Sequence, residues 1–184
     1  MSTTSPRVLT RFIPAVLCCL LVASCGETPL GELPEVPSGD EEPGLLRSLQ
    51  NLHNAAEREP ADAIARGRLG MAYDVNGFPE RAIVVYGQAA ILDGNAFDWP
   101  YFRALLQAHT HTDYEGALAS LDAALAIDDS YVPAWLARGT WLHRLNRPEE
   151  ARTAFDRAAN LGAGAPAMMG IANLYIDAGE FERA

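Results

Sequence analysis

The chain has 184 residues, 49% of them hydrophobic, and its 24 acidic and 14 basic side chains give a formal net charge of -10. This length allows one ordinary domain with appended segments. All of the basic residues are arginine. Because so acidic a surface repels phosphate backbones, the composition argues against nucleic-acid binding.

The first 25 residues have the pattern of an export signal. Arg7 and Arg11 form a positive region, and an apolar stretch of twelve residues follows from Phe12 to Ala23. A membrane-spanning helix needs about 20 apolar residues, so this stretch predicts a secretory signal instead. Its end, VASC, resembles the lipobox of bacterial lipoproteins, which implies cleavage after Ser24 and lipidation of Cys25. The alternative is an ordinary signal peptide that leaves Cys25 free.

The cysteines and the residue after Cys25 extend this interpretation. Cys18 and Cys19 lie within the signal (residues 1–24), so no disulfide is expected in the mature chain. Gly26 stands where enteric lipoproteins kept at the inner membrane have aspartate. By that resemblance, we expect a lipid anchor in the outer membrane, facing the periplasm.

Residues 25–44 are rich in proline and acidic side chains and show no apolar period. A segment of this composition cannot bury a core of its own, so the sequence predicts a disordered tether that starts at the lipidated Cys25.

A repeat of helix pairs follows the tether. Ala82, Ala117, Ala151 and Ala184 recur at spacings of 35, 34 and 33 residues. We expect each alanine to lie at the start of the second helix of a pair. Turn residues precede these helices, and prolines recur where the first helices begin, at Pro100, Pro133 and Pro166.

Small and large residues recur in the same register around these alanines. Gly70 and Gly139 are the small residues that let two helices approach, while large residues fill the space beside them; these are Tyr73, Tyr86, Trp135 and Phe155. The pattern resembles the 34-residue unit of tetratricopeptide repeat (TPR) proteins. That resemblance implies an all-α, right-handed α-solenoid. Its expected parts are an N-terminal capping half-repeat at 45–60 and repeats at about 63–96, 98–131, 132–164 and 165–184, the last one incomplete.

The second unit departs most from the TPR pattern, because Tyr101, Ala104, Leu105 and Ala108 replace its usual residues. The final unit holds one helix and only the first turn of the next. We therefore expect the sequence to be an N-terminal fragment of a longer chain; the alternative is a natural end with a frayed half-repeat.

No catalytic constellation, phosphate-binding loop or metal-site motif stands out, so we expect neither an enzyme nor a cofactor. TPR proteins bind partners in a concave groove lined by their first helices. The resemblance places twelve residues there: Met71, Asp74, Trp99, Phe102, Leu106, His109, Thr140, His143, Arg144, Met169, Asn173 and Asp177.

Three features of this groove leave alternatives open. Trp99 and Phe102 could instead pack between repeats. The groove lacks the lysine and asparagine clamp that chaperone-binding members use for a C-terminal carboxylate. Asp74, His109 and His143 share one repeat position, which suggests a pH-sensitive or metal-assisted contact or, alternatively, solvent-exposed helix ends.

The expected function is that of a non-catalytic scaffold, anchored to the bacterial envelope, that binds a protein or peptide partner, as in envelope assembly. The alternative is an accessory TPR region of a longer enzyme or assembly protein. Self-association through the repeat ends is a third hypothesis.

Overall fold

The computed structural model describes residues 30–39 and 41–183. This part of the chain forms eight α-helices and one short 3-10 helix, and it contains no strand. The predicted signal, Cys25 and Ala184 lie outside the described residues. The helices are α1 (Pro43–Arg58), α2 (Ala63–Val75), α3 (Pro79–Leu92), α4 (Asp98–Thr110), α5 (Tyr114–Ile127), α6 (Val132–Arg144), α7 (Pro148–Asn160) and α8 (Ala165–Asp177), followed by the 3-10 helix η1 (Phe181–Arg183).

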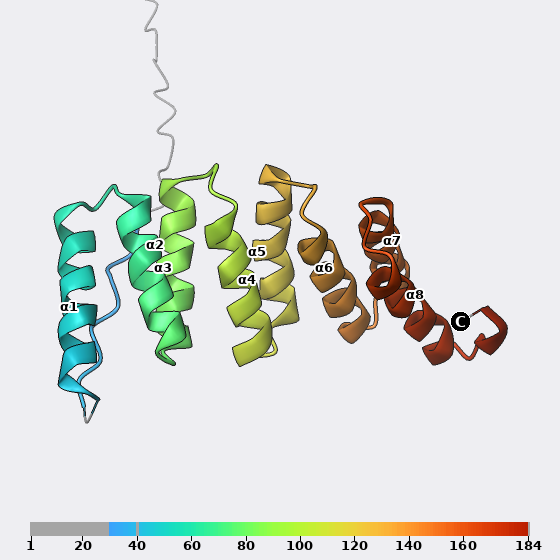
Figure 1. The fold of residues 1–184 in the computed structure, drawn as a ribbon, viewed down its shortest axis with the longest axis horizontal. Coiled ribbons are helices and arrows are strands. Elements are labelled where there is room, and N and C mark those ends of the chain that lie inside the picture. Colours follow the sequence, from blue (N-terminus) through green and yellow to red (C-terminus); the bar gives the residue numbers. More distant parts are fainter. Residues whose placement is uncertain (1–29, 40, 184) are drawn as a thin grey trace, which may run out of the picture.

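The helices follow one another along a single row in chain order (Figure 1). The helices α2 and α3, α4 and α5, and α6 and α7 form antiparallel pairs, and α8 begins a fourth unit. Each helix also contacts helices of the neighbouring unit. The predicted all-α solenoid of helix pairs is therefore confirmed.

Local sequence signals explain where the helices end. Gly77 and Asn146 adopt positive φ angles of 80° and 57° after α2 and α6. In each turn the amide that follows reaches back to the helix: Phe78 N donates to Tyr73 O and Arg147 N to Leu142 O, both at 2.9 Å. This is the Schellman pattern, which satisfies the last carbonyl groups of a helix. The next helix then starts directly at a proline.

Aromatic rings lie on glycines inside the helix pairs. A Cβ atom added to Gly70 would lie 2.8 Å from the ring of Tyr86, and one added to Gly139 would lie 2.6 Å from the ring of Phe155. Because only glycine leaves room for these rings, the recurring glycine and aromatic residue together set how closely the two helices of a unit approach.

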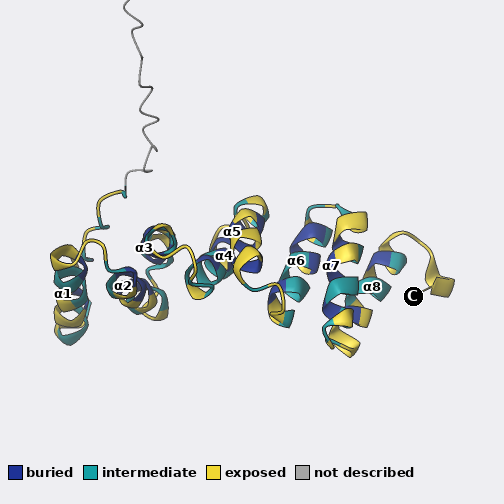
Figure 2. Cartoon of the chain, turned by 90° about the horizontal axis from the view of Figure 1, so that it is seen from above, coloured by how far each residue is buried: buried dark blue, intermediate teal, exposed yellow. Residues whose placement is uncertain are grey.

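The buried residues form two clusters that meet at α4. The N-terminal cluster joins α1, α2 and α3, and Trp99, Phe102 and Leu106 of α4 pack against it. The C-terminal cluster extends from α4 to α8. Figure 2 shows buried residues on the sides of the helices that face their neighbours.

The segment before α1 differs from the expected tether. Residues 31–38, which we call the N-terminal strap, form no helix but pack between α1 and the first pair, where Figure 1 shows them in blue. Leu33 and Val36 pack against the N-terminal cluster, and Pro37 is buried. This part of the chain is therefore ordered, because it uses the surface of the repeats as its core.

The two ends of the described solenoid differ in character. The exposed residues of α1 are polar apart from Pro43, whereas α8 exposes apolar side chains, among them Met168, Met169 and Ile176. Among the described residues, no helix combines the length and hydropathy that crossing a membrane requires.

Candidate binding groove

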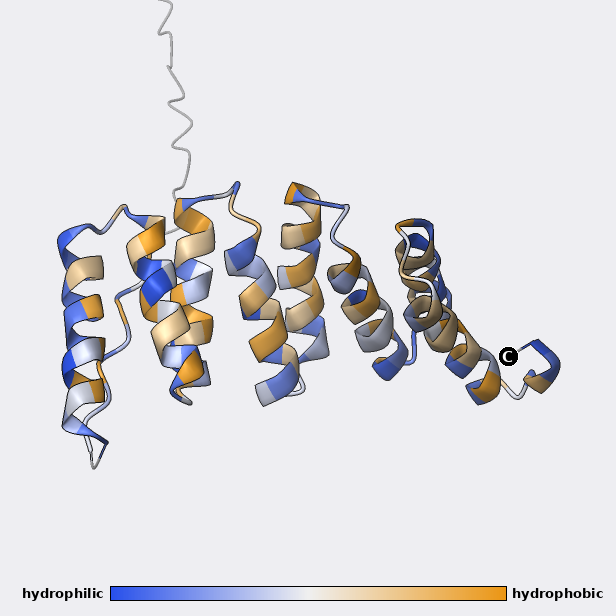
Figure 3. Cartoon of the chain, in the orientation of Figure 1, coloured by the Kyte–Doolittle hydropathy of each residue, from blue (hydrophilic) through white to orange (hydrophobic). Residues whose placement is uncertain are grey.

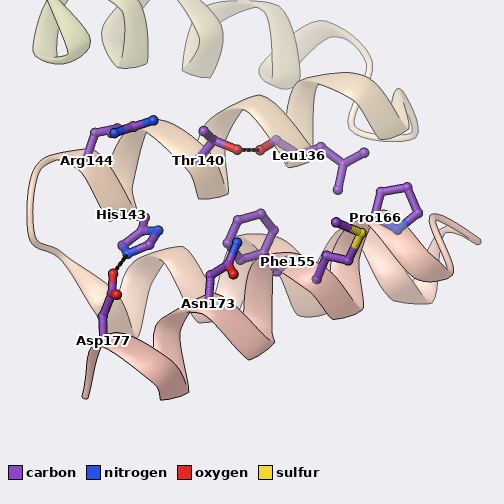
Figure 4. A pocket seen from close by; sticks show the side chains of 10 residues that line it. Leu136, Thr140, His143, Arg144, Phe155, Pro166, Asn173 and Asp177 are labelled. Atoms are coloured by element: carbon purple, nitrogen blue, oxygen red, sulfur yellow. Dashed lines mark hydrogen bonds and ion pairs between the residues drawn. The ribbon is translucent and has the colours of Figure 1, made fainter. Parts of the chain in front are cut away.

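A cavity of the groove lies between α6 and α8 (Figure 4). It is an open cavity of about 710 Å³, within the range of ligand-binding pockets. Its walls carry both apolar and polar side chains. The residues that line it are Leu136, Thr140, His143, Arg144, Phe155, Pro166, Met169, Gly170, Asn173 and Asp177.

The floor of the cavity is the ring of Phe155, which α7 places between two glycines. A Cβ atom on Gly139 of α6 would lie 2.6 Å from this ring, and one on Gly170 of α8 would lie 2.5 Å from it. The ring therefore rests against the backbones of both first helices. Leu136, Pro166 and Met169 extend this apolar surface.

Polar groups form the rim. His143 and Asp177 join α6 to α8 through an Nε2–Oδ2 contact of 2.7 Å, drawn as a dashed line in Figure 4. The hydroxyl of Thr140 donates to Leu136 O of its own helix at 2.8 Å. Arg144 is exposed and pairs with no carboxylate within the described residues, so its guanidinium is available to an incoming group.

The structure brings six of the twelve expected groove residues together around this cavity: Thr140, His143, Arg144, Met169, Asn173 and Asp177. Trp99 and Phe102 behave differently, since both rings lie beside that of Tyr86, at centroid distances of 6.2 and 5.7 Å. A Cβ atom on Gly67 would collide with the indole of Trp99. These two side chains and Leu106 pack between the first two repeats.

The hypothetical row of Asp74, His109 and His143 does not form a joint site. Asp74 accepts a hydrogen bond of 3.4 Å from the Tyr86 hydroxyl, and His109 Nδ1 lies 2.7 Å from Leu105 O. No cluster of three metal-binding side chains occurs within the described residues. The contact of His143 is with Asp177, so the metal-assisted version of the hypothesis is not supported by the geometry.

Burial governs the protonation of Tyr86 in this region. Burial first, and then the negative charge of Asp74, raise the pKa of its hydroxyl well above the ordinary value of 10. Tyr86 thus stays protonated and donates to Asp74, which links α3 to the groove residue Asp74 of α2. Met71 remains exposed there.

Sequence reasoning missed Leu136, Phe155, Pro166 and Gly170 as lining residues. A helical spacing could have indicated those on α8, because Pro166, Gly170, Asn173 and Asp177 follow one another at three or four residues and share one face. Phe155 had no such signal, since it belongs to a second helix and reaches the cavity between two glycines.

The helices and this groove form an α-solenoid of helix pairs. No protein-family model matches the chain, and neither does any curated protein. Solved structures do match. The crystal structure of MamA superposes with a TM-score of 0.68 over 74% of this chain and 80% of MamA, at 18% identity. A form of MamA from Desulfovibrio magneticus RS-1, covering residue 41 to the end, gives 0.66 over 76% and 79%, at 19% identity.

A third structure is similar over a shorter range. The second TPR domain of human RPAP3, solved in complex with the HSP70 peptide SGPTIEEVD, matches with a TM-score of 0.55 over 61% of this chain and 93% of that domain, at 28% identity. The likeness to MamA shows the fold alone. Together these structures confirm the predicted resemblance: the chain has the fold of a TPR protein.

Proposed function

We propose that this protein is a non-catalytic TPR scaffold whose first-helix groove binds a segment of a protein partner. The cavity between α6 and α8 carries the proposal. It offers an apolar floor at Phe155 and Met169 beneath a polar rim with the exposed Arg144. Such a site suits a large apolar side chain flanked by polar backbone or side-chain groups, as in extended peptides.

The similarity to the second TPR domain of RPAP3 supports a peptide as the class of ligand, because that domain is bound to the HSP70 peptide. The HSP70 peptide itself is not proposed as the ligand of this chain. The rim of the cavity in this chain carries Arg144 and Asn173 and no lysine, so it does not rebuild a lysine and asparagine clamp. The partner is therefore proposed on the shape and chemistry of the cavity, not on a shared carboxylate site.

We further propose that Cys25 anchors the scaffold to the bacterial envelope. The anchor would lie in the outer membrane, and the repeats would face the periplasm. The VASC pattern at the end of the apolar stretch supports this assignment. The intact mass of protein extracted from its native membrane tests it. A chain that starts at Cys25 and carries three acyl chains is expected, and a mass without added lipid would refute the anchor.

A matched pair of methionines tests the binding site. Met168 and Met169 are adjacent and similarly exposed, at 69% and 66%, but only Met169 lines the cavity. We expect Met169→Glu to weaken partner binding at least tenfold, because the carboxylate places a charge against the apolar floor. Met168→Glu introduces the same charge outside the cavity and should leave binding within twofold.

The partner for this measurement comes from photo-crosslinking in cells. A photoreactive phenylalanine analogue at Asn173, on the rim, should capture a protein that the same analogue at the exposed Thr153 of α7 does not. Titration of that protein against the two methionine variants then gives the affinities. Equal loss of affinity in both variants, or capture from Thr153 alone, would show that the partner binds elsewhere.

A further inference from the structure

We infer that the N-terminal strap, residues 31–38, is a fixed mount. By this we mean a segment that is docked on the first repeat and holds the membrane-anchored end of the chain at one edge of the solenoid. The membrane-facing edge of the solenoid would then be set by the fold. This inference rests on the proposed lipid anchor at Cys25. It goes beyond that anchor because it states which edge of the molecule lies next to the lipid surface.

Backbone carbonyl groups of the strap are held by side chains of α2 and α3. Gln88 Nε2 donates to Gly31 O and to Glu32 O, both at 2.8 Å. Arg81 Nε donates to Glu35 O at 2.9 Å. The Tyr73 hydroxyl lies 3.4 Å from Pro34 O. The repeats supply all of these donors, and the strap supplies backbone acceptors that any residue type would offer.

A buried arginine orients the most important of these donors. Arg66 is 5% exposed, and its Nη1 donates to Gln88 Oε1 at 2.6 Å. The other end of the Gln88 amide, which carries the two N–H groups, consequently faces the strap. Arg66 also reaches Pro60 O at 3.4 Å. Burial lowers the pKa of Arg66, because it removes water from the guanidinium group. The hydrogen bonds of Arg66 to Gln88 and Pro60 offset this loss of hydration.

Apolar contacts and prolines add to the attachment. Leu33 and Val36 pack against the N-terminal cluster, and Pro37 is buried. Pro34 and Pro37 have fixed φ angles, so the strap loses less conformational entropy on docking than an ordinary segment of its length. The strap therefore combines directional hydrogen bonds with burial, which is what a fixed attachment requires.

The direction of the strap identifies the edge from which the preceding chain departs. Gly31 is bonded to Gln88, near the C-terminal end of α3, while Glu35 is bonded to Arg81, near its start. The strap thus runs antiparallel to α3. Its first residue lies at the edge that also carries the loop of residues 93–97, whereas the turn at Asn76 lies at the opposite edge.

The short chain between Cys25 and the strap limits how the repeats can be oriented relative to the membrane. From Cys25 to Gly31 there are six residue steps, which span at most roughly 20 Å. A tether that was free as far as Gly44 would have nineteen steps and could extend to roughly 65 Å. The docked strap removes most of that freedom and keeps the edge with the 93–97 loop close to the anchor.

The surface at this edge carries several acidic side chains, so the strap is the feature proposed to hold it at the membrane. The loops at this edge include Asp93, Asp128 and Asp129, and Figure 3 shows hydrophilic segments there beside apolar helix ends, where Ile91 and Ile127 are exposed. Acidic groups gain nothing from a lipid surface of neutral or negative charge. The strap is bonded to Arg81 and Gln88 of α3 and to Tyr73 of α2, and none of its residues lines the cavity between α6 and α8, which stays open to a partner.

The test compares two labels at opposite edges of one helix. Asn95 follows α3 and Asn76 precedes it, both are exposed, and the 14 residues of α3 separate them by about 20 Å. The lipidated protein, made as Asn95→Cys or Asn76→Cys, is labelled with a fluorophore and reconstituted into vesicles of phosphatidylethanolamine and phosphatidylglycerol. The vesicles contain a headgroup-labelled acceptor lipid. We expect at least twofold more energy transfer from Asn95 than from Asn76.

The second part of the test repeats the energy-transfer measurement with a variant in which the strap is released. Leu33→Ser with Val36→Ser removes the apolar contacts of the strap and should reduce the difference between the labels by more than half. Glu32→Ser with Glu35→Ser changes two exposed residues of the same strap and should preserve it. Equal transfer from both labels in a chain whose mass shows the lipid would overturn the mount alone. A chain without lipid would overturn the mount together with the anchor.

Discussion

Gln88 is the residue on which the buried polar contacts of the strap converge. It accepts from Arg66 and donates to two strap carbonyl groups, and it is itself buried. We expect Gln88→Ala to lower the free energy of unfolding by about 1–3 kcal/mol, because it leaves buried hydrogen-bonding groups without partners. Urea unfolding followed by circular dichroism gives this value.

The same variant should also free the strap to proteolysis. Cleavage by a glutamate-specific protease after Glu32 and Glu35 is expected to become at least fivefold faster than in the wild type. Gln50→Ala is the control, since Gln50 is exposed and bonds only to Asn54 within the described residues. If Gln88→Ala behaved like Gln50→Ala in both measurements, the strap would not depend on this amide.

Asn146 is a second residue whose backbone conformation predicts the sign of a stability change. Its φ of 57° lies in the left-handed region, where a side chain with a Cβ atom is disfavoured and asparagine is better tolerated than alanine. We expect Asn146→Ala to cost about 1 kcal/mol of stability and Asn146→Gly to stay within about 0.5 kcal/mol of wild type. Thermal unfolding of the pair measures the effect, and an alanine variant as stable as the glycine variant would contradict it.

At the scale of helices, the contact between α7 and α8 depends on Gly170. Its backbone touches the ring of Phe155, which also forms the floor of the cavity. Gly170→Ala should destabilise the fold by about 1–3 kcal/mol, because the buried ring must move to admit the methyl group. Partner binding should weaken with it. Gly94→Ala is a matched control, since a Cβ atom there meets nothing within 4 Å.

Either of two results would argue against this packing. Urea unfolding could show equal stability for Gly170→Ala and Gly94→Ala, or the partner could bind Gly170→Ala as tightly as wild type. The first result would mean that α8 shifts without cost. The second would mean that the floor of the cavity does not touch the partner.

Sequence periodicity predicted the helices well because their signals are local. Turn residues at Gly77 and Asn146 and the prolines after them fix where helices start and end, and these signals act within five residues. The strap could not be predicted in this way. Its composition is typical of disorder, and the residues that order it, Arg81 and Gln88, lie 46 and 56 or 57 positions away in the chain.

For the groove, the sequence predicted which residues share a helix face but not the direction of each side chain. The repeat register assigned Thr140, His143 and Asn173 to neighbouring first helices, and all three line one cavity in the structure. It could not tell that Trp99 turns into the interface with α2. That direction depends on the space above Gly67 and on the ring of Tyr86, both of which belong to the preceding unit.

At the scale of the whole molecule, the solenoid has two buried clusters joined through one helix. One face of α4 packs with the N-terminal cluster through Phe102, and another packs with the C-terminal cluster, against which Phe97 also lies just before the helix. Repeat proteins are stabilised by contacts between neighbouring units, so a local change can lower the stability of one part more than another. The two phenylalanines therefore form a matched pair.

We expect Phe102→Ala to weaken α1, α2 and α3 selectively. The ring centroids of Phe102 and Tyr86 are 5.7 Å apart. Removing the partly buried ring of Phe102 should lower the free energy of opening of α1, α2 and α3 by roughly 2 kcal/mol. Amide hydrogen exchange followed helix by helix measures this quantity. In α6 and α7 the change should stay within about 0.5 kcal/mol, because distant sites are nearly independent. Phe97→Ala should show the reverse distribution, with its loss in α4, α5 and α6. A uniform loss in both variants would mean that the solenoid opens as one cooperative unit and that α4 is not a boundary within it.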